Sequence, residues 1–417
     1  MLSELALRLN RILRPKRLVN IVDSSYLIRY LRKFAGASVF TIESNSCGVI
    51  STTFTLFGFI CFILWYSTYF YCLYKIHVDD QTILRSLYDT KLKHYGDEVE
   101  RIMHTMFILY AIWKVPFDLS DSAKDMQLIV DIDKAMKNLV GEIDYSRHLH
   151  LAIVICLSQF IISGTRVFSI WVSLFNLGRS MPIEKVFQMV FTDCVAFIIV
   201  TQYCTYLVIL RRRYELLNNV LNSVNSSESF VLRFITPRTI DKTFLVQEKK
   251  VCKKIKACGK IYSMLYKATE TANEKFGLVL LLTMLMTLLQ LVLYLYYFME
   301  ATASGLFRDL QNYIDFLIYI AWQIGFALTI IYVCIYYSEA TVKEARTTAH
   351  VAHEIINSDV NPTIITEAVN LSLQTLQQTP TFTAHGLFKL DHVILLEGAR
   401  SVTTYLVILL QFVTGKH

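Results

Sequence analysis

The most diagnostic segment reads Thr404-Tyr405-Leu406-Val407-Ile408-Leu409-Leu410-Gln411-Phe412, close to the C-terminal end of the sequence. A polar pair is followed by five aliphatic residues and then by an amide and a phenyl ring. Hydrocarbon offers an amide nothing to hydrogen-bond with, so a lone glutamine facing lipid is costly. We therefore expect Gln411 to face protein or water.

Composition places the whole chain in a membrane. Of its 417 residues, 54% are hydrophobic and only 18% are charged, against about 25% charged residues in soluble domains. The net charge of +7 sits in loops that flank apolar segments, which is typical of membrane topology rather than of nucleic-acid binding. The sequence predicts an all-α, integral membrane protein that binds no nucleic acid.

A membrane span needs about 20 mostly apolar residues. Seven segments are candidates: 48–74, 101–119, 149–175, 186–210, 276–299, 313–337 and 402–413 with its flanks. The seventh is interrupted by Glu397, Gly398 and Arg400, so we expect an inner helix ending near residue 400 and a short span that begins at Val402. Such a short helix is better accommodated among copies of itself than alone in lipid.

Basic residues predict the orientation. One side of the predicted topology carries 29 Lys and Arg residues and the other carries seven. The richer side faces the cytosol, which places the N-terminus inside and, with seven spans, the C-terminus outside. G-protein-coupled receptors have the same number of spans in the opposite orientation.

The domain organisation follows from these spans. We expect a cytosolic N-terminal region (1–46), a six-helix transmembrane bundle (47–337) with a cytosolic insert (211–275), cytosolic anchor helices (338–400) and a last helix (401–417). Within the cytosolic parts, apolar spacing predicts helices at 213–222, 244–275, 338–357 and 363–378, with an irregular break at 223–243. Six lysines between 249 and 260 form a basic run that is expected to lie near anionic lipid or to take a nucleotide or lipid regulator.

The terminal segment resembles the signature ending of insect gustatory receptors, Thr-Tyr, five hydrophobic residues and Gln-Phe, at every position. The preceding stretch Ala384-His385-Gly386-Leu387-Phe388-Lys389-Leu390-Asp391 is similar to that family too. The resemblance implies a homotetrameric ligand-gated channel, or a hetero-oligomer with related receptors. It also implies a multi-pass protein in the plasma membrane of a sensory neuron, with the last helix of each subunit around a central pore.

The resemblance implies that the last helix carries the gate of the channel. Gln411, Phe412 and Leu409 would each form a ring in a symmetric oligomer, where apolar rings close a pore by dewetting and amides pass hydrated cations. The alternative is that Gln411 packs against a neighbouring helix of its own subunit. Thr404 and Tyr405 are expected to hold the last helix against its neighbours.

A small-ligand pocket needs aromatic walls and a few polar groups. The outer halves of the predicted spans supply both, and the candidates are His104, Arg166, Asp193, Gln290, Tyr294, Tyr319, Trp322 and Gln323. Tyrosines can also be simple interface residues, and Arg166 and Asp193 can simply pair with each other. Tyr319, Trp322 and Gln323 share one helical face, which suits a sugar ring and a planar alkaloid equally.

No constellation for catalysis or metal binding is visible. His350 and His353 on a cytosolic helix, and His148 and His150 near the third span, lack an evident third ligand. Cys252 and Cys258 do not have a zinc spacing. The sequence therefore predicts a protein that is not an enzyme and that needs no cofactor.

The predicted function is a tastant-gated, non-selective cation channel. Its ligand is expected to be a bitter or plant-derived compound, with a fructose-like sugar close behind, and the need for co-subunits stays open. One alternative, a metabotropic seven-helix receptor, requires an outside N-terminus. The other, a transporter, would usually show an internal repeat.

Overall fold

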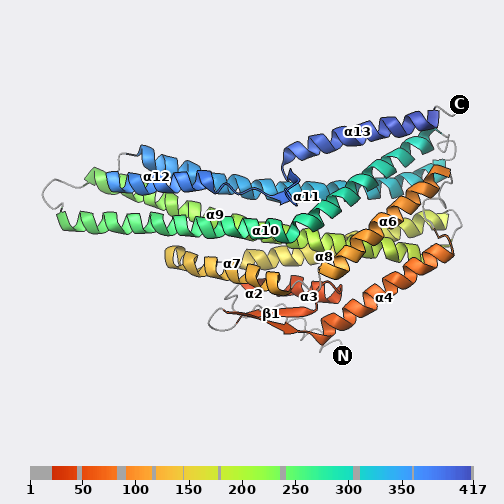
Figure 1. Ribbon diagram of the computed structural model, residues 1–417, viewed down its shortest axis with the longest axis horizontal. Coiled ribbons are helices and arrows are strands. Elements are labelled where there is room, and N and C mark those ends of the chain that lie inside the picture. The colour runs from red at the N-terminus through yellow and green to blue at the C-terminus, as the bar shows by residue number, and fades with distance from the viewer. Residues whose placement is uncertain are drawn as a thin grey trace.

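The computed structural model describes residues 21–44, 49–81, 91–114, 119–143, 145–176, 180–234, 241–303, 310–358 and 361–414. Within these ranges the chain is almost entirely helical and has two short antiparallel hairpins. The helices lie roughly along one long axis, and they splay apart towards the end that carries the C-terminus (Figure 1). The predicted all-α class is confirmed.

Three long helices form the central body. They are α9 (Ile183–Phe234), α10 (Asp241–Ala303) and α11 (Leu310–Asn357), and each packs on the other two. The 63 residues of α10 span about 95 Å at 1.5 Å per residue, roughly three times the ~30 Å of a bilayer core. Much of this body must therefore lie outside the membrane.

The end away from the splayed helices contains α12 (Pro362–Gln377), which packs against α10 and α11. Asn361 caps α12, since its side chain accepts a hydrogen bond from the Thr363 amide at 3.3 Å, and Pro362 occupies the first helical position. The predicted cytosolic helices are all present, as α12 or as continuations of α9, α10 and α11. The predicted break at 223–243 is shorter than expected, because α9 continues to Phe234 and α10 begins at Asp241.

Four further helices complete the splayed end: α4 (Leu56–Val78), α6 (Lys91–Lys114), α8 (Ser146–Asn176) and α13 (His392–Thr414). In the described ranges, five helices are long and apolar enough to cross a membrane: α4, α8, α9, α10 and α11. The most apolar windows of α4 and α8 are only 22% buried, against 67% for α9, so α4 and α8 lie at the outside of the bundle while α9 is central. Helices α6 and α13 each pack against α10 (Figure 1) and complete a seven-helix bundle.

The region before the first span differs from the prediction. Strands β1 (Phe40–Ser44) and β2 (Ile50–Phe54) form a hairpin, and α4 begins at Leu56 rather than at residue 48. β-branched Thr52 and Thr53 favour a strand over a helix at this point. Two short helices, α2 (Ile21–Ser24) and α3 (Tyr26–Phe34), precede the hairpin, and α7 (Leu119–Val140) fills most of the connection between the second and third predicted spans.

The last helix is continuous, so the break predicted near residue 400 is wrong. A side chain at Gly398 would meet no atom within 4 Å, and Glu397 and Arg400 are exposed. One helical glycine costs only about 1 kcal/mol, and exposed charges do not oppose the helix. Nothing at these three residues therefore interrupts α13.

Candidate functional site

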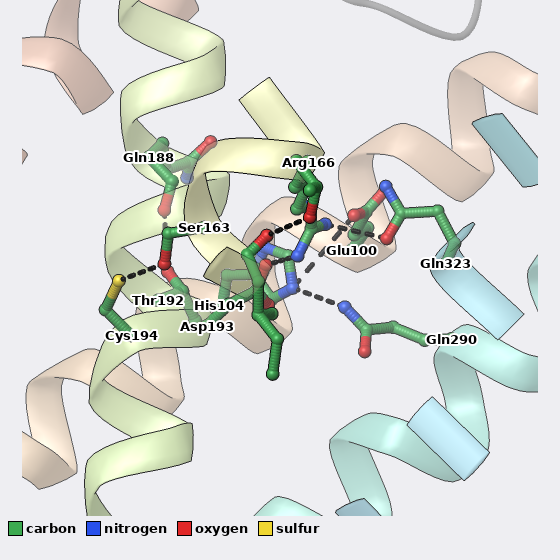
Figure 2. A network of polar contacts seen from close by, with 12 residues as sticks. Glu100, His104, Ser163, Arg166, Gln188, Thr192, Asp193, Cys194, Gln290 and Gln323 are labelled. Carbon is green, nitrogen blue, oxygen red and sulfur yellow. Dashed lines mark hydrogen bonds and ion pairs between the residues drawn. The ribbon is translucent and has the colours of Figure 1, made fainter. Parts of the chain in front are cut away.

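A buried polar cluster lies inside the splayed half of the bundle, where α6, α8, α9, α10 and α11 meet (Figure 2). At its centre, Arg166 of α8 forms an ion pair with Asp193 of α9. The Arg166 Nη2 also donates to Oε1 of Gln323 on α11, at 2.6 Å. All three residues are at most 6% exposed. Arg166 thus ties three helices together at one level.

The other half of the cluster joins α6 to α10. Nε2 of Gln290 donates to Nε2 of His104 at 2.8 Å, which assigns the ring proton to His104 Nδ1. The Tyr294 hydroxyl donates to Oε1 of Glu100 at 3.0 Å, and Glu100 lies one helical turn from His104, 4.0 Å away. Two polar contacts therefore connect α6 to α10.

The charges of the cluster balance. Lys185 is also buried, and its Nζ donates to Oε1 of Gln188 at 3.3 Å. Two cations, Arg166 and Lys185, offset two carboxylates, Asp193 and Glu100. Balance matters here because an unpaired charge in a dry interior costs several kcal/mol.

Aromatic rings cover this polar cluster. The Tyr294 ring meets the rings of Tyr297 and Tyr319 edge-on, each with a centroid distance of 6.1 Å. The Arg166 guanidinium lies 5.5 Å from the centroid of Phe326. The cluster combines aromatic walls with convergent polar groups, which is the composition of a small-molecule site.

The space beside Arg166 is nearly closed. A cavity lined by Arg166, Asp193 and Phe326 has a volume of about 10 Å³, which is room for about one water molecule. Within the described residues, several buried polar atoms in and beside the cluster make no hydrogen bond, among them His104 Nδ1, Ser169 Oγ and Trp322 Nε1. A ligand would have to separate the helices to enter, and it would find polar groups still to satisfy.

Seven of the eight predicted ligand residues converge in this cluster, and their part in ligand binding stays a prediction. Trp322 is half-buried, and its indole nitrogen makes no hydrogen bond in the described part of the chain. Arg166 and Asp193 pair with each other in the structure, as one of the two predicted alternatives had it. Sequence reasoning missed Glu100 and Lys185, because the second and fourth spans were placed from residues 101 and 186, whereas α6 begins at Lys91 and α9 at Ile183. The four-residue spacing of Glu100 and His104 was the available signal.

Two apolar side chains hold α13 against the rest of the bundle. Val402 is buried, and Leu406 packs against the buried group that includes Tyr294 and Tyr319. Tyr405 is 57% exposed, and the Thr404 hydroxyl donates to the Arg400 carbonyl of its own helix. Within one chain, Val402 and Leu406 therefore hold the helix, and neither Thr404 nor Tyr405 does.

The end of α13 carries the predicted gate residues. Gln411 is exposed; both its part in a pore and its packing inside its own subunit stay predictions. The side chains of Leu409 and Phe412 lie outside the part of the chain that the structure describes.

A small hairpin connects α12 to α13 and is fastened to α10. Its strands are β3 (Thr383–Ala384) and β4 (Phe388–Lys389). Asn273 Nδ2 donates to the Thr381 carbonyl at 2.7 Å, and Asn273 Oδ1 accepts from the Thr383 amide at 3.0 Å. At the far side of the hairpin, His392 forms an ion pair with Glu339 of α11 at 2.9 Å. This hairpin belongs to the stretch that resembles gustatory receptors, and it joins the last helix to α10.

Comparison with known proteins agrees with this architecture. The model of a family described as 7tm Chemosensory receptor matches residues 25–414. The chain belongs to this chemosensory receptor family. The predicted family is thereby confirmed, and so is the prediction of a receptor rather than an enzyme, in the plasma membrane with several spans.

Two curated relatives within this receptor family are similar in sequence. The putative gustatory receptor 28b of Drosophila melanogaster is 21% identical over 435 residues, which cover 98% of this chain and 88% of the relative. The putative gustatory receptor 28a of the same species is 28% identical over 158 residues, 38% of this chain and 35% of the relative.

Two solved structures share the receptor fold at 10% identity. They are the insect olfactory receptor OR5 from Machilis hrabei, with a TM-score of 0.53, and the same receptor in complex with eugenol, with a TM-score of 0.58. Each match covers 94% of this chain and 100% of the olfactory receptor chain. These likenesses confirm the seven-helix fold.

Proposed function

We propose that this receptor is a tastant-gated, non-selective cation channel in which α13 of each subunit lines a central pore. One observation carries the proposal: Leu406 of α13 rests on the same buried group as Tyr294, whose hydroxyl belongs to the polar cluster. A movement of Tyr294 in the cluster would therefore reach α13, the helix that carries the proposed gate, through the side chain of Leu406.

Population shift supplies the mechanism. In the closed arrangement the cluster is sealed by its own ion pair and hydrogen bonds. A ligand that replaces some of these contacts favours a wider bundle, and its effect equals its difference in affinity between the two states. Because α10 holds both Tyr294 and the hairpin that leads to α13, displacement of α10 would carry the last helix with it.

The assembly follows from the exposed face of α13. Val393, Leu396, Tyr405, Val407 and Ile408 are at least 41% exposed, and Gln411 lies farther along the same helix. An amide is costly in lipid but is suited to a water-filled axis. Copies arranged head to tail form a closed ring, and the family resemblance favours four, alone or with related receptors.

The ligand class we favour is a bitter or plant-derived compound of the size of a few rings. Tyr294, Tyr319 and Phe326 offer aromatic walls, and most polar groups of the cluster already bind one another. A sugar would need a partner for each of its hydroxyls, because an unpaired buried hydroxyl costs about 1–3 kcal/mol. Sensory-neuron expression belongs to the same proposal.

Whole-cell current from cells that express this chain alone tests the proposal. We expect a fast cation current on perfusion with bitter plant compounds rather than sugars, insensitive to block of G-protein signalling, with conductance altered in Gln411→Ala. A slow response that disappears on G-protein block would establish the metabotropic alternative instead.

A further inference from the structure

We propose that a hollow at the opposite, inner end of the bundle binds an anionic phospholipid whose headgroup carries additional phosphates. This site is separate from the polar cluster around Arg166. It rests on the predicted orientation, which places α7 and the first half of α10 in the cytosol, and it needs no assumption about the tastant or the pore.

The part of the hollow nearer the splayed helices is mainly apolar. A cavity of about 90 Å³ lies between α3, β1, α7, α9 and α10. Ile28, Ile129, Ile209 and Phe276 contribute to its walls. Two cationic side chains, Arg29 and Arg32 of α3, also line it. Apolar walls together with guanidinium groups suit the upper acyl chain and the phosphate of a lipid.

A second, more polar space adjoins the first. It measures about 380 Å³ and is lined by Lys124, Asp125, Leu128, Lys267, Thr271, Glu274 and Lys275 of α7 and α10. Asp125 and Lys275 line both spaces and form an ion pair at 2.7 Å with side chains at most 10% exposed. The two spaces are thus two parts of one hollow on either side of this pair.

The charges of the combined hollow favour an anion. Its lining includes five cations, Arg29, Arg32, Lys124, Lys267 and Lys275, against the two carboxylates Asp125 and Glu274. Lys124 and Lys267 are exposed at the surface of α7 and α10, where they can reach a multiply charged headgroup.

The order of the two spaces matches an amphiphile. Phe276, at the predicted membrane edge of α10, lines the apolar space, whereas Lys267 lines the polar one, nine residues or about 13 Å farther from the membrane. A phospholipid of the inner leaflet has the same order, with its chains towards the bilayer and its headgroup towards the cytosol. A soluble phosphate would use only the polar space.

The short helix α3 fits a membrane surface. Tyr30 is 60% exposed and Phe34 is 47% exposed, and both alternate with the basic residues Arg29, Arg32 and Lys33. Such a helix lies in the interface, with rings in the headgroup region and cations near phosphates. Arg29 also donates to the carbonyls of Val22 and Ile42, so it anchors β1 and is best left unchanged in a test.

The lysine run predicted to lie near lipid serves as the control. Lys249 and Lys250 are exposed on α10, but they lie 26 or more residues before Phe276, about 40 Å along the helix. They carry the same charge as Lys124 and Lys267 without bordering the hollow.

The test uses the full-length receptor in phosphatidylcholine nanodiscs that contain a photoactivatable phosphatidylinositol bisphosphate. We expect cross-linked peptides from α3, α7 and α10. Labelling should be roughly thirtyfold weaker in the double variant Lys124→Gln/Lys267→Gln, since each lysine near a lipid surface contributes about 1 kcal/mol of attraction. Lys249→Gln/Lys250→Gln should label as the wild type does.

Two results would overturn the proposal. Equal labelling of the wild type and of Lys124→Gln/Lys267→Gln would remove the site. Complete competition by soluble inositol trisphosphate or by inorganic phosphate would assign the hollow to a free phosphate compound instead of a lipid. Both readouts are independent of current, so channel failure and lipid-site failure remain distinguishable.

Discussion

Gly277 of α10 lies directly against the backbone of His385 in the hairpin that precedes the last helix. A methyl group at residue 277 would be 2.9 Å from the His385 nitrogen and 3.1 Å from its Cα. His385 and Gly386 both have positive φ angles, 52° and 74°, so the turn has little freedom to yield. This contact sets where α13 begins relative to α10.

Gly277→Ala is therefore expected to displace the hairpin, at a cost of about 1–3 kcal/mol for overpacking, and to shift the agonist concentration–response curve by roughly tenfold. Whole-cell current measures the shift. The matched control is Gly164→Ala in α8, where a methyl group meets no atom within 4 Å. An unchanged curve in Gly277→Ala would show that the hairpin does not transmit motion.

Asp193→Asn tests the centre of the polar cluster. The change leaves the buried Arg166 guanidinium without its carboxylate, and removal of one partner of a buried pair costs about 3–5 kcal/mol. We expect a lower unfolding temperature of the purified receptor and less protein at the cell surface. The double variant Arg166→Met/Asp193→Leu should recover much of the stability, since it removes both charges.

If the single Asp193→Asn variant were as stable as the wild type, the ion pair of Arg166 and Asp193 would not be shielded from water. If the double variant were stable yet responded normally to agonist, the cluster would be structural only.

A second buried ion pair stabilises the inner end of the bundle. Arg213 of α9 donates from Nε and Nη2 to the two carboxylate oxygens of Asp133 on α7, each at 2.9 Å, and lies 3.1 Å from Nε2 of His148. The Tyr145 hydroxyl donates to Asp133 at 2.9 Å. Burial, with the neighbouring Asp133 carboxylate, raises the pKa of Tyr145, so the phenol keeps its proton at physiological pH.

Arg213→Lys cannot reproduce this fork, because an ammonium group lacks the planar pair of donors. We expect a loss of about 2–3 kcal/mol in the free energy of unfolding, equivalent to one or two charge-assisted hydrogen bonds, measured by thermal denaturation. The neighbouring change Arg212→Lys is the control, because its pair with Glu215 is partly exposed and such pairs are worth about 0–1 kcal/mol. Equal losses in the two variants would contradict the account.

The sequence predicted the spans well where apolar length alone decides them, as in α4, α8, α9, α10 and α11. It failed at the ends of elements. Glu100 looked too polar for a span, because its pairing with Tyr294 comes from α10 and only folding brings the two together. Gly398 looked like a helix break, because the sequence does not show that its surroundings are open.

The residues of the candidate site were largely predicted from the sequence, but their contacts were not. Residue type and predicted depth selected His104, Arg166, Asp193, Gln290 and Gln323, all of which converge in the bundle. The sealed state of the cluster, the contact of Leu406 with the Tyr294 group and the contact of Gly277 with His385 depend on tertiary distances. Periodicity carries no information about such distances.

The most direct test of the central claim is access to Gln411→Cys from the outer solution. During agonist-evoked current, a membrane-impermeant cationic thiol reagent should reach residue 411 and block the current, while the wild type is unaffected. Val78→Cys, at the exposed end of α4 on the opposite edge of the subunit (Figure 1), should be modified without block. Unchanged current after proven modification of Gln411→Cys would contradict the claim that α13 lines the pore.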